Sequence, residues 1–149
     1  AHMKCLDGLL QNSVASLMEL NLNGNALDKK TIESVMAILP KAPGMKTLHL
    51  RACGLNEAAL VALVRQVESS SYIETLDISG NKVTEKAANA IASMMAKSAT
   101  LNTLSLISCA IKDKKTITTL ANGLKTGHIV RFNMDGNKLE EKGLKAVSF

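Results

Sequence analysis

The chain has 149 residues, the length of one domain, and its 46% hydrophobic and 21% charged residues are sufficient to build a large core. No apolar run approaches the ~18 residues that a membrane span needs, so membrane insertion is not expected. One Tyr, two Phe and no Trp leave little material for stacking bases, which argues against nucleotides and single-stranded nucleic acid as ligands.

The N-terminal residues bear on the organisation of the chain. Ala1-His2-Met3 resembles a cloning remnant, so residues 1–3 are set apart, and residues 4–149 are expected to form a single domain within a longer protein. Apolar residues within 5–12 favour a leading helix. Three cysteines, an odd number, argue against a disulfide framework and indicate a reducing compartment.

An eleven-residue pattern, Leu-x-x-Leu-x-Leu-x-x-(Asn/Cys)-x-Leu, recurs five times at a constant interval of 28 residues. The copies begin at Leu17, Met45, Ile73, Leu101 and Ile129. The ninth position alternates strictly, as Asn25, Cys53, Asn81, Cys109 and Asn137. The regular interval predicts a solenoid in which each repeat is one structural unit.

Each repeat combines a strand signal with a helix signal. The Leu-x-Leu segment has the alternation of a short strand, and the residues after it have apolar side chains at helical spacing. Asp28, Asn56 and Thr84 are N-cap residue types at the same 28-residue interval. In the fourth repeat the cap, Asp113, and the apolar face are both displaced by one residue, which predicts one residue inserted before that helix and one deleted after it. Leu144 and Val147 take the first core positions of a fifth helix, close to the end of the chain.

A strand and a helix of this length cannot bury their apolar faces alone, so stacked repeats must share one core. The sequence therefore predicts an α/β horseshoe of about five repeats, a right-handed β-α solenoid with a parallel sheet on its concave face and helices on its convex face. The repeat length, the helix in each repeat and the Asn/Cys alternation resemble the ribonuclease-inhibitor class of leucine-rich repeats over residues 5–149. The resemblance implies an intracellular location, taken here as cytoplasmic, and protein binding.

The ninth position has a structural interpretation. Asn both donates and accepts hydrogen bonds, whereas Cys tolerates burial as a small apolar group. We expect Asn81 to be the most costly asparagine to replace, through bonds to the coils on both sides. Cys53 and Cys109 lie two strands apart, about 10 Å, which is beyond disulfide reach. No Cys-x-x-Cys or His-x-x-x-His spacing occurs, so no metal site and no cofactor are expected.

The strand positions that face away from the core form lateral rows on the concave face. One row contains His49, Asp77 and Ser105, but a serine triad needs the histidine between the other two, and here Asp77 is central. The glycines of the pattern are turn residues rather than a phosphate loop, so no catalytic residue is expected. The candidate partner-binding residues are His49, Arg51, Asp77, Ile107, Arg131 and Asp135.

The net charge of +5 does not lie on the concave rows, which carry three acidic and two basic residues. Lysines recur instead near the helix starts, where acidic residues accompany them at the same interval. A solvated edge of mixed charge is the favoured interpretation, and an anion-binding or nucleic-acid surface is the alternative. The lysines are Lys30, Lys86, Lys114 and Lys142, and the acids are Glu57, Glu85, Asp113 and Glu141.

These observations favour a non-enzymatic scaffold that binds a protein partner through its concave face and rim loops. Two alternatives stay open. One is a GTPase activator that resembles Ran GTPase-activating protein, and the other is a cytoskeletal or assembly protein that resembles the repeat domain of tropomodulin. No catalytic motif distinguishes between them.

Overall fold

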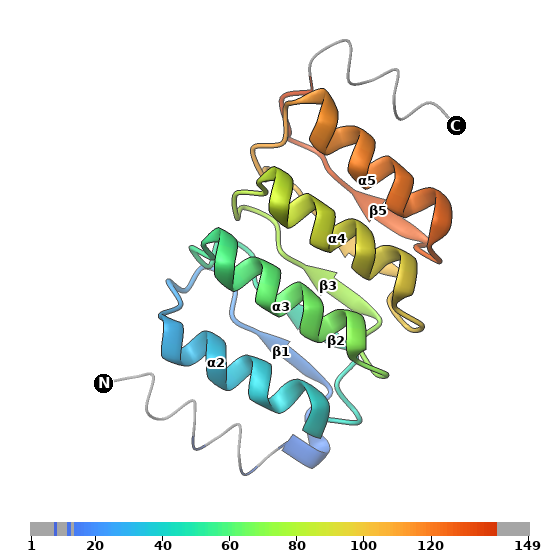
Figure 1. Ribbon diagram of the computed structural model, residues 1–149. Helices are drawn as coiled ribbons and strands as arrows, with labels where there is room; N and C mark the ends of the chain where they lie inside the picture. The colour runs from blue at the N-terminus through green and yellow to red at the C-terminus, as the bar shows by residue number, and fades with distance from the viewer. Residues whose placement is uncertain (1–7, 9–11, 13, 140–149) are drawn as a thin grey trace.

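The computed structural model describes residues 8, 12 and 14–139, and within them five strands and four helices alternate along the chain. The strands form one sheet and the helices cover one of its faces (Figure 1). The strands are β1 (Glu19–Asn21), β2 (Thr47–His49), β3 (Thr75–Asp77), β4 (Thr103–Ser105) and β5 (Arg131–Asn133). The helices are α2 (Lys29–Ile38), α3 (Glu57–Ser69), α4 (Glu85–Lys97) and α5 (Lys114–Thr126), with short 3₁₀ segments η1 (Val14–Ser16) and η2 (Leu39–Lys41).

The sheet follows the order of the chain, β1-β2-β3-β4-β5, and all neighbouring strands are parallel. Each strand residue pairs with the residue 28 positions later, as Leu20 does with Leu48 and Leu76 with Leu104. This register confirms the repeat interval and the predicted leucine-rich-repeat fold. It also places equivalent residues of successive repeats side by side in rows across the sheet.

The core lies between the sheet and the helices and is almost entirely aliphatic. The central strand residues Leu48, Leu76 and Leu104 are fully buried, and the inner faces of α3 and α4 meet them. Four of the five repeats supply a fully formed strand and helix to this layer, and the equivalent Phe132 of β5 is only partly buried. Phe132 is therefore less buried than the equivalent leucines of the four preceding strands.

Every predicted helix cap is present. The side chains of Asp28, Asn56, Thr84 and Asp113 each accept a hydrogen bond from the backbone N–H three residues later, at 2.8, 2.9, 3.2 and 2.8 Å. The position of Asp113 confirms the one-residue insertion before α5. The bond from the Thr116 backbone is the largest of the causes that lower the pKa of Asp113.

The turns after the strands divide the repeats into two types, which we call Asn-type (first, third and fifth) and Cys-type (second and fourth) after their ninth residue. The eighth residue has a positive φ in every repeat, from 52° at Ala52 to 72° at Gly24. The Cys-type turns have a second positive φ at the tenth residue, 65° at Gly54 and 57° at Ala110. The alternation seen in the sequence is thus an alternation of backbone geometry.

The side chain of Asn81 connects its own coil to the preceding one. Its Oδ1 accepts from the N–H groups of Cys53 and Leu55, at 3.2 and 3.1 Å. Its Nδ2 donates to the carbonyl oxygens of Leu50 and Ile78, at 2.8 and 2.9 Å. The expectation of side-chain bonds to both neighbouring coils was wrong, because the inward-pointing amide reaches only backward along the stack.

The two described cysteines are free and fully buried, as expected for packing residues. The Sγ of Cys53 lies 3.2 Å from the carbonyl oxygen of Leu22, and that of Cys109 lies 3.7 Å from that of Ile78. Burial raises the pKa of Cys53 and raises that of Cys109 to about 11. Both thiols are therefore neutral and shielded at neutral pH.

Some expectations fall outside the described residues. These are the role of Cys5, most of the leading helix over 5–12, the fifth helix with Leu144 and Val147, and the charges at Glu141 and Lys142. Within the part of the chain that the structure describes, no helix has both the length and the hydropathy of a membrane span.

Candidate protein-binding face

Two lateral rows cross the face of the sheet that the helices leave uncovered (Figure 1). The first contains Glu19, three threonines and Arg131, and its two charged ends are exposed while the threonines are half-buried. The second contains His49 beside Asp77 on adjacent strands. The register therefore confirms that the candidate residues of both rows share one surface.

The third predicted row, at the seventh position of each repeat, is only partly a surface. Arg51 and Asp135 are exposed and Ile107 is half-buried, but Ser79 is fully buried. The Oγ of Ser79 accepts from the N–H of Ile107 at 3.0 Å and lies 2.9 Å from the Oγ of Ser105. Alternation along the strand predicts that Ser79 faces solvent, and this prediction is wrong, because the short side chain folds back to pair with the next strand.

His49 occupies a mixed environment on the concave face. Its Nε2 lies 3.5 Å from Oε1 of Glu19, and its Nδ1 is buried without a hydrogen-bond partner. Asp77 on the other side uses Oδ1 to accept the N–H of Ser79 at 2.9 Å, which holds the turn after β3. One carboxylate oxygen of Asp77 is thus committed to the fold.

The six candidate residues do not form one cluster. His49, Arg51 and Asp77 lie on neighbouring strands, whereas Arg131 and Asp135 belong to the last repeat. Arg51 and Arg131 are three strands apart, about 14 Å at ~4.8 Å per strand, and they lie in different rows. The two candidate arginines are therefore separated points on the concave face rather than parts of one charged cluster.

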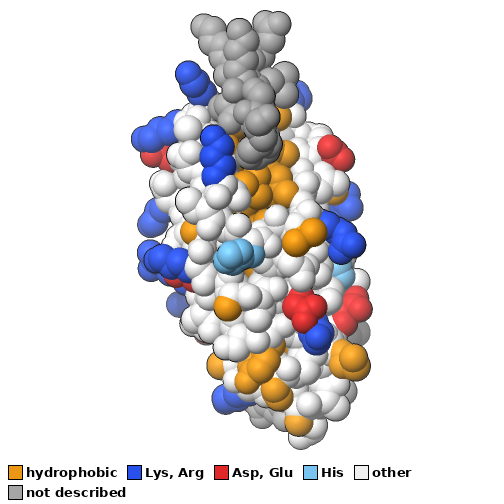
Figure 2. Space-filling view, turned by 90° about the vertical axis from the view of Figure 1, so that its right-hand side faces the viewer, with side chains coloured by type: hydrophobic (Ala, Val, Ile, Leu, Met, Phe, Trp, Pro, Cys, Tyr) orange, Lys and Arg blue, Asp and Glu red, His pale blue; other side chains and the backbone are white. Residues whose placement is uncertain are grey.

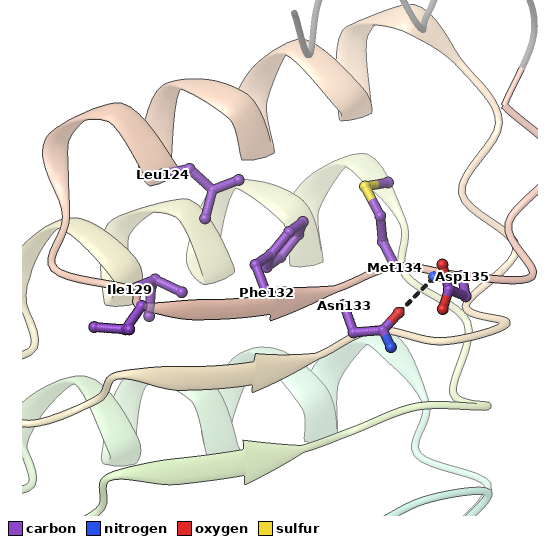
Figure 3. A pocket seen from close by; sticks show the side chains of 7 residues that line it. Leu124, Ile129, Phe132, Asn133, Met134 and Asp135 are labelled. Atoms are coloured by element: carbon purple, nitrogen blue, oxygen red, sulfur yellow. Dashed lines mark hydrogen bonds between the residues drawn. The ribbon is translucent and has the colours of Figure 1, made fainter. Parts of the chain in front are cut away.

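The last described strand borders a hollow of about 670 Å³ that the sequence did not indicate. Figure 3 shows Leu124 of α5 above Ile129 at the left of the view, Phe132 of β5 in the middle and Met134, in the turn after β5, at the right. The side chains are those that a following coil would cover, as each inner repeat covers its predecessor. The periodic core positions were visible in the sequence, but the opening depends on which neighbour lies over them.

Exposed hydrophobic residues gather on the rim where helices end and strands begin. Met18, Tyr72 and Val130 precede β1, β3 and β5, and Val130 is 77% exposed. Figure 2 shows hydrophobic side chains concentrated toward the two ends of this rim. At the position equivalent to Met18 and Val130, the inner repeats carry Lys46 and Glu74, whose side chains form a 2.8 Å ion pair. At this repeat position a polar pair thus replaces the exposed hydrophobic side chains found at the two ends of the rim.

The edge near the helix starts has the mixed charge expected from the sequence. Lys86 pairs with Glu57 at 3.8 Å, and Lys115, which the sequence did not single out, pairs with Glu85. A different set of lysines lies in the loops between strands and helices: Lys82, Lys112 and Lys138. It was missed because Lys112 does not occupy the repeat position that Lys82 and Lys138 share. Among the described residues, no group of three His, Cys, Asp or Glu side chains is placed to hold a metal ion.

Comparison with known proteins places these features in context. The profile of the family described as the PRAME C-terminal domain matches residues 6–147. RAN GTPase-activating protein 2 of Arabidopsis thaliana is 33% identical over 97 residues, which are 63% of this chain and 18% of that protein. The chain therefore spans about a fifth of the length of this relative.

Two solved structures have a similar fold. The actin-binding site 2 domain of leiomodin-1 superposes with a TM-score of 0.77 at 17% sequence identity, covering 90% of this chain and 79% of that one. The tropomodulin C-terminal domain of Caenorhabditis elegans gives a TM-score of 0.79 at 11% identity, covering 99% and 89% of the two chains. At these identities the likeness is one of fold.

Proposed function

The chain belongs to the PRAME C-terminal domain family, whose fold here is a leucine-rich-repeat solenoid, and on this premise we propose that it is a non-enzymatic protein-binding module. The partner is held by the concave face together with the loops at its rims. The observation that carries the proposal is the regular presentation of exposed charged groups, Arg51, Arg131 and Asp135, on a rigid sheet. Rigid display lowers the entropic cost of binding.

The area of the concave face supports the involvement of the rims. Five strands at ~4.8 Å and three outward residues per strand give a floor of roughly 300 Å². A standard interface takes about 800 Å² from each partner. Even with a twofold allowance for surface roughness the floor alone is too small, so a specific complex needs contacts from the loops or from further repeats.

The similar proteins suggest the first partners to try. RAN GTPase-activating protein 2 acts, by its name, on a Ran GTPase, and the similar domain of leiomodin-1 is an actin-binding site. Co-sedimentation with filamentous actin and the rate of GTP hydrolysis by Ran are therefore measured first. Accelerated GTP hydrolysis would overturn the non-enzymatic part of the proposal, whereas simple binding to either protein supports it.

A search without an assumed partner uses a photo-crosslinking amino acid in place of Ile107, on the concave face. The matched control carries the same group in place of Lys41, which is exposed in η2. We expect one protein to be crosslinked from position 107 and not from position 41, and that protein is then purified for affinity measurements.

The affinity measurement compares Arg51→Glu plus Arg131→Glu with a control of equal charge change, Lys41→Glu plus Lys125→Glu. We expect the concave pair to weaken binding by at least about tenfold, equivalent to ~1.4 kcal/mol, and the control to have little effect. Both variants should keep the parental melting temperature, because all four side chains are exposed. Equal affinity of the parent and the concave variant would show that the partner binds elsewhere.

A further inference from the structure

A second hollow, of about 600 Å³, lies in the loops that connect the strands to the helices in the third, fourth and fifth repeats. We call it the rim hollow. It is separate from the concave rows and from the opening beside β5. Its lining consists of Lys82, Ser108, Ala110, Lys112, Gly136 and Lys138.

The repeat pattern explains why three lysines line the rim hollow. Lys82 and Lys138 are the tenth residues of the third and fifth repeats, so they flank the fourth repeat on both sides. That repeat has Ala110 at the equivalent position, with φ at 57°, and its inserted residue lengthens the loop that carries Lys112. Lys82 and Lys138 from Asn-type turns and Lys112 from the Cys-type loop between them thus line one hollow, together with the small side chain of Ala110.

The floor of the rim hollow is kept open by small residues. Gly136 has a φ of 68°, and a Cβ atom there would lie 2.5 Å from Oγ of Ser108. Any other residue at this position would therefore crowd the hydroxyl of Ser108. The absence of side-chain bulk at Ala110 and Gly136 lets the stems of the lysines border a space rather than a packed surface.

The three lysines have no acidic partner within the described residues. Their side chains are exposed and form no ion pair there, whereas Lys86 and Lys115 on the adjacent helix edge pair with Glu57 and Glu85. No Asp or Glu lines the rim hollow. Asp113 follows Lys112, but its carboxylate caps α5 through the N–H of Thr116 at 2.8 Å. The rim hollow is therefore a concentration of uncompensated positive charge beside a compensated edge.

We propose that the rim hollow binds an acidic segment of a protein partner, a run of Asp and Glu residues in extended conformation; this inference rests on the proposed protein-binding function. The space is far larger than a single small anion needs. Lys82 and Lys138 belong to repeats two strands apart, about 10 Å, and an extended segment covers that distance with about three residues. Because alternate side chains of an extended segment point to the same side, a run of about five acidic residues directs three carboxylates toward the three cations.

The residue types favour carboxylates over nucleic acid. Lysine is a flexible point charge with a strongly hydrated ammonium group, and the rim hollow contains no arginine fork for bidentate phosphate recognition. It also contains no aromatic side chain on which a base would stack.

The test uses the full chain and a fluorescent dodecapeptide with a central run of Asp and Glu, followed by anisotropy. The matched peptide has Asn and Gln in place of the acids. We expect the acidic peptide alone to bind, with an affinity that falls at least tenfold between 50 and 300 mM salt. Equal binding of the neutral peptide, or no binding of the acidic one at low salt, would overturn the proposal.

The residues are tested with the triple variant Lys82→Met, Lys112→Met and Lys138→Met against the control Lys29→Met, Lys41→Met and Lys125→Met, which loses the same charge from other surfaces. We expect the rim variant to lose at least tenfold in peptide affinity and the control less than threefold. Both must show the parental circular dichroism and melting curve. Equal losses of peptide affinity in the two variants would show that net charge alone explains the binding, and would overturn the proposed site.

Further arms separate competing explanations. Glu140 and Glu141 follow Lys138 in the sequence, outside the described residues, so the comparison is repeated with both changed to Gln, and a lysine effect that disappears there would contradict the proposal. A single-stranded dodecanucleotide that binds more tightly than the peptide, and is lost in the rim variant, would reassign the site to nucleic acid. The variant Arg51→Glu plus Arg131→Glu should still bind the acidic peptide. The proposal for the concave face and the proposal for the rim hollow can therefore be contradicted separately.

Discussion

The third and fourth repeats have the same length of strand and helix but hold their turns in different ways. In the third, the amide of Asn81 satisfies backbone groups of two coils and is only 2% exposed. In the fourth, the thiol of Cys109 contributes only two long contacts, to the carbonyl oxygens of Ile78 at 3.7 Å and Ile107 at 3.6 Å. The comparison shows that side chains of the Asn-type repeats make the polar bonds between repeats. The Cys-type repeats take part in these bonds through their backbone groups.

At other positions of the turn, too, an Asn-type repeat supplies the side chain and a Cys-type repeat supplies the backbone group. The N–H of Arg51 is held by Oδ1 of Asn23, and that of Ile107 by Oγ of Ser79, so each Cys-type turn is bonded by the Asn-type repeat before it. The following Asn-type repeat bonds it again, as Asn137 does for the N–H groups of Cys109 and Ile111. Each Cys-type turn is thus held from both sides without supplying an amide of its own.

The largest expected effect comes from removing the central amide. Asn81→Ala leaves the buried N–H groups of Cys53 and Leu55 without their acceptor, and we expect a loss of about 2–3 kcal/mol in the free energy of unfolding. Asn137→Ala removes equivalent bonds from a half-buried site, where water replaces part of them, and should cost less. Urea unfolding of the two variants measures the difference. Equal midpoints would contradict the claim that the buried amide of Asn81 stabilises the fold more than the half-buried amide of Asn137.

The next effect concerns the thiol of the fourth repeat at alkaline pH. Because burial raises the pKa of Cys109 from 9.0 to about 11, the folded chain holds this proton more tightly than the unfolded chain. Its contribution to stability is complete below pH 9 and is lost as the pH rises through 11, about 3 kcal/mol in all. We expect Cys109→Ala to flatten the fall in unfolding free energy above pH 9.

Cys53→Ala is the control for this measurement, since it keeps Cys109 and hence the steep decline. Thiol labelling gives an independent check. Both buried cysteines should react only when the chain opens, so rapid labelling of native protein would contradict their shielding.

The smallest effects test the turn backbone itself. Gly80 has a φ of 70°, and an added Cβ would lie 3.3 Å from the backbone N of Ala52, so Gly80→Ala should cost about 1–2 kcal/mol. Ala52 already has a φ of 52°, which glycine adopts without strain. Ala52→Gly should therefore raise the free energy of unfolding by about 0.5 kcal/mol, a value that includes the opposing effect of glycine's greater freedom in the unfolded chain. Thermal unfolding of both variants checks the opposite signs.

The fold was predictable to the level of register, because contacts between repeats join residues one repeat interval apart. The caps at Asn56 and Asp113 were predictable for the same reason, since the displaced cap and the displaced apolar face indicated the same insertion. The burial of Ser79 was not predictable, because alternation along a strand does not show that a short hydroxyl turns back into the sheet. The rim hollow was missed because Lys112 meets Lys82 and Lys138 only after an insertion breaks the period.

The backward reach of the asparagine amides makes a pair of repeats the smallest unit that can be added to the stack. Two Cys-type turns in succession would bury the N–H groups of the first against a thiol, which accepts weakly. Two Asn-type turns in succession would direct an amide at a coil that lacks the second positive φ found at Gly54 and Ala110. Insertion or deletion of a single repeat therefore leaves a mismatched joint, whereas insertion or deletion of an Asn/Cys pair preserves every bond across the seam.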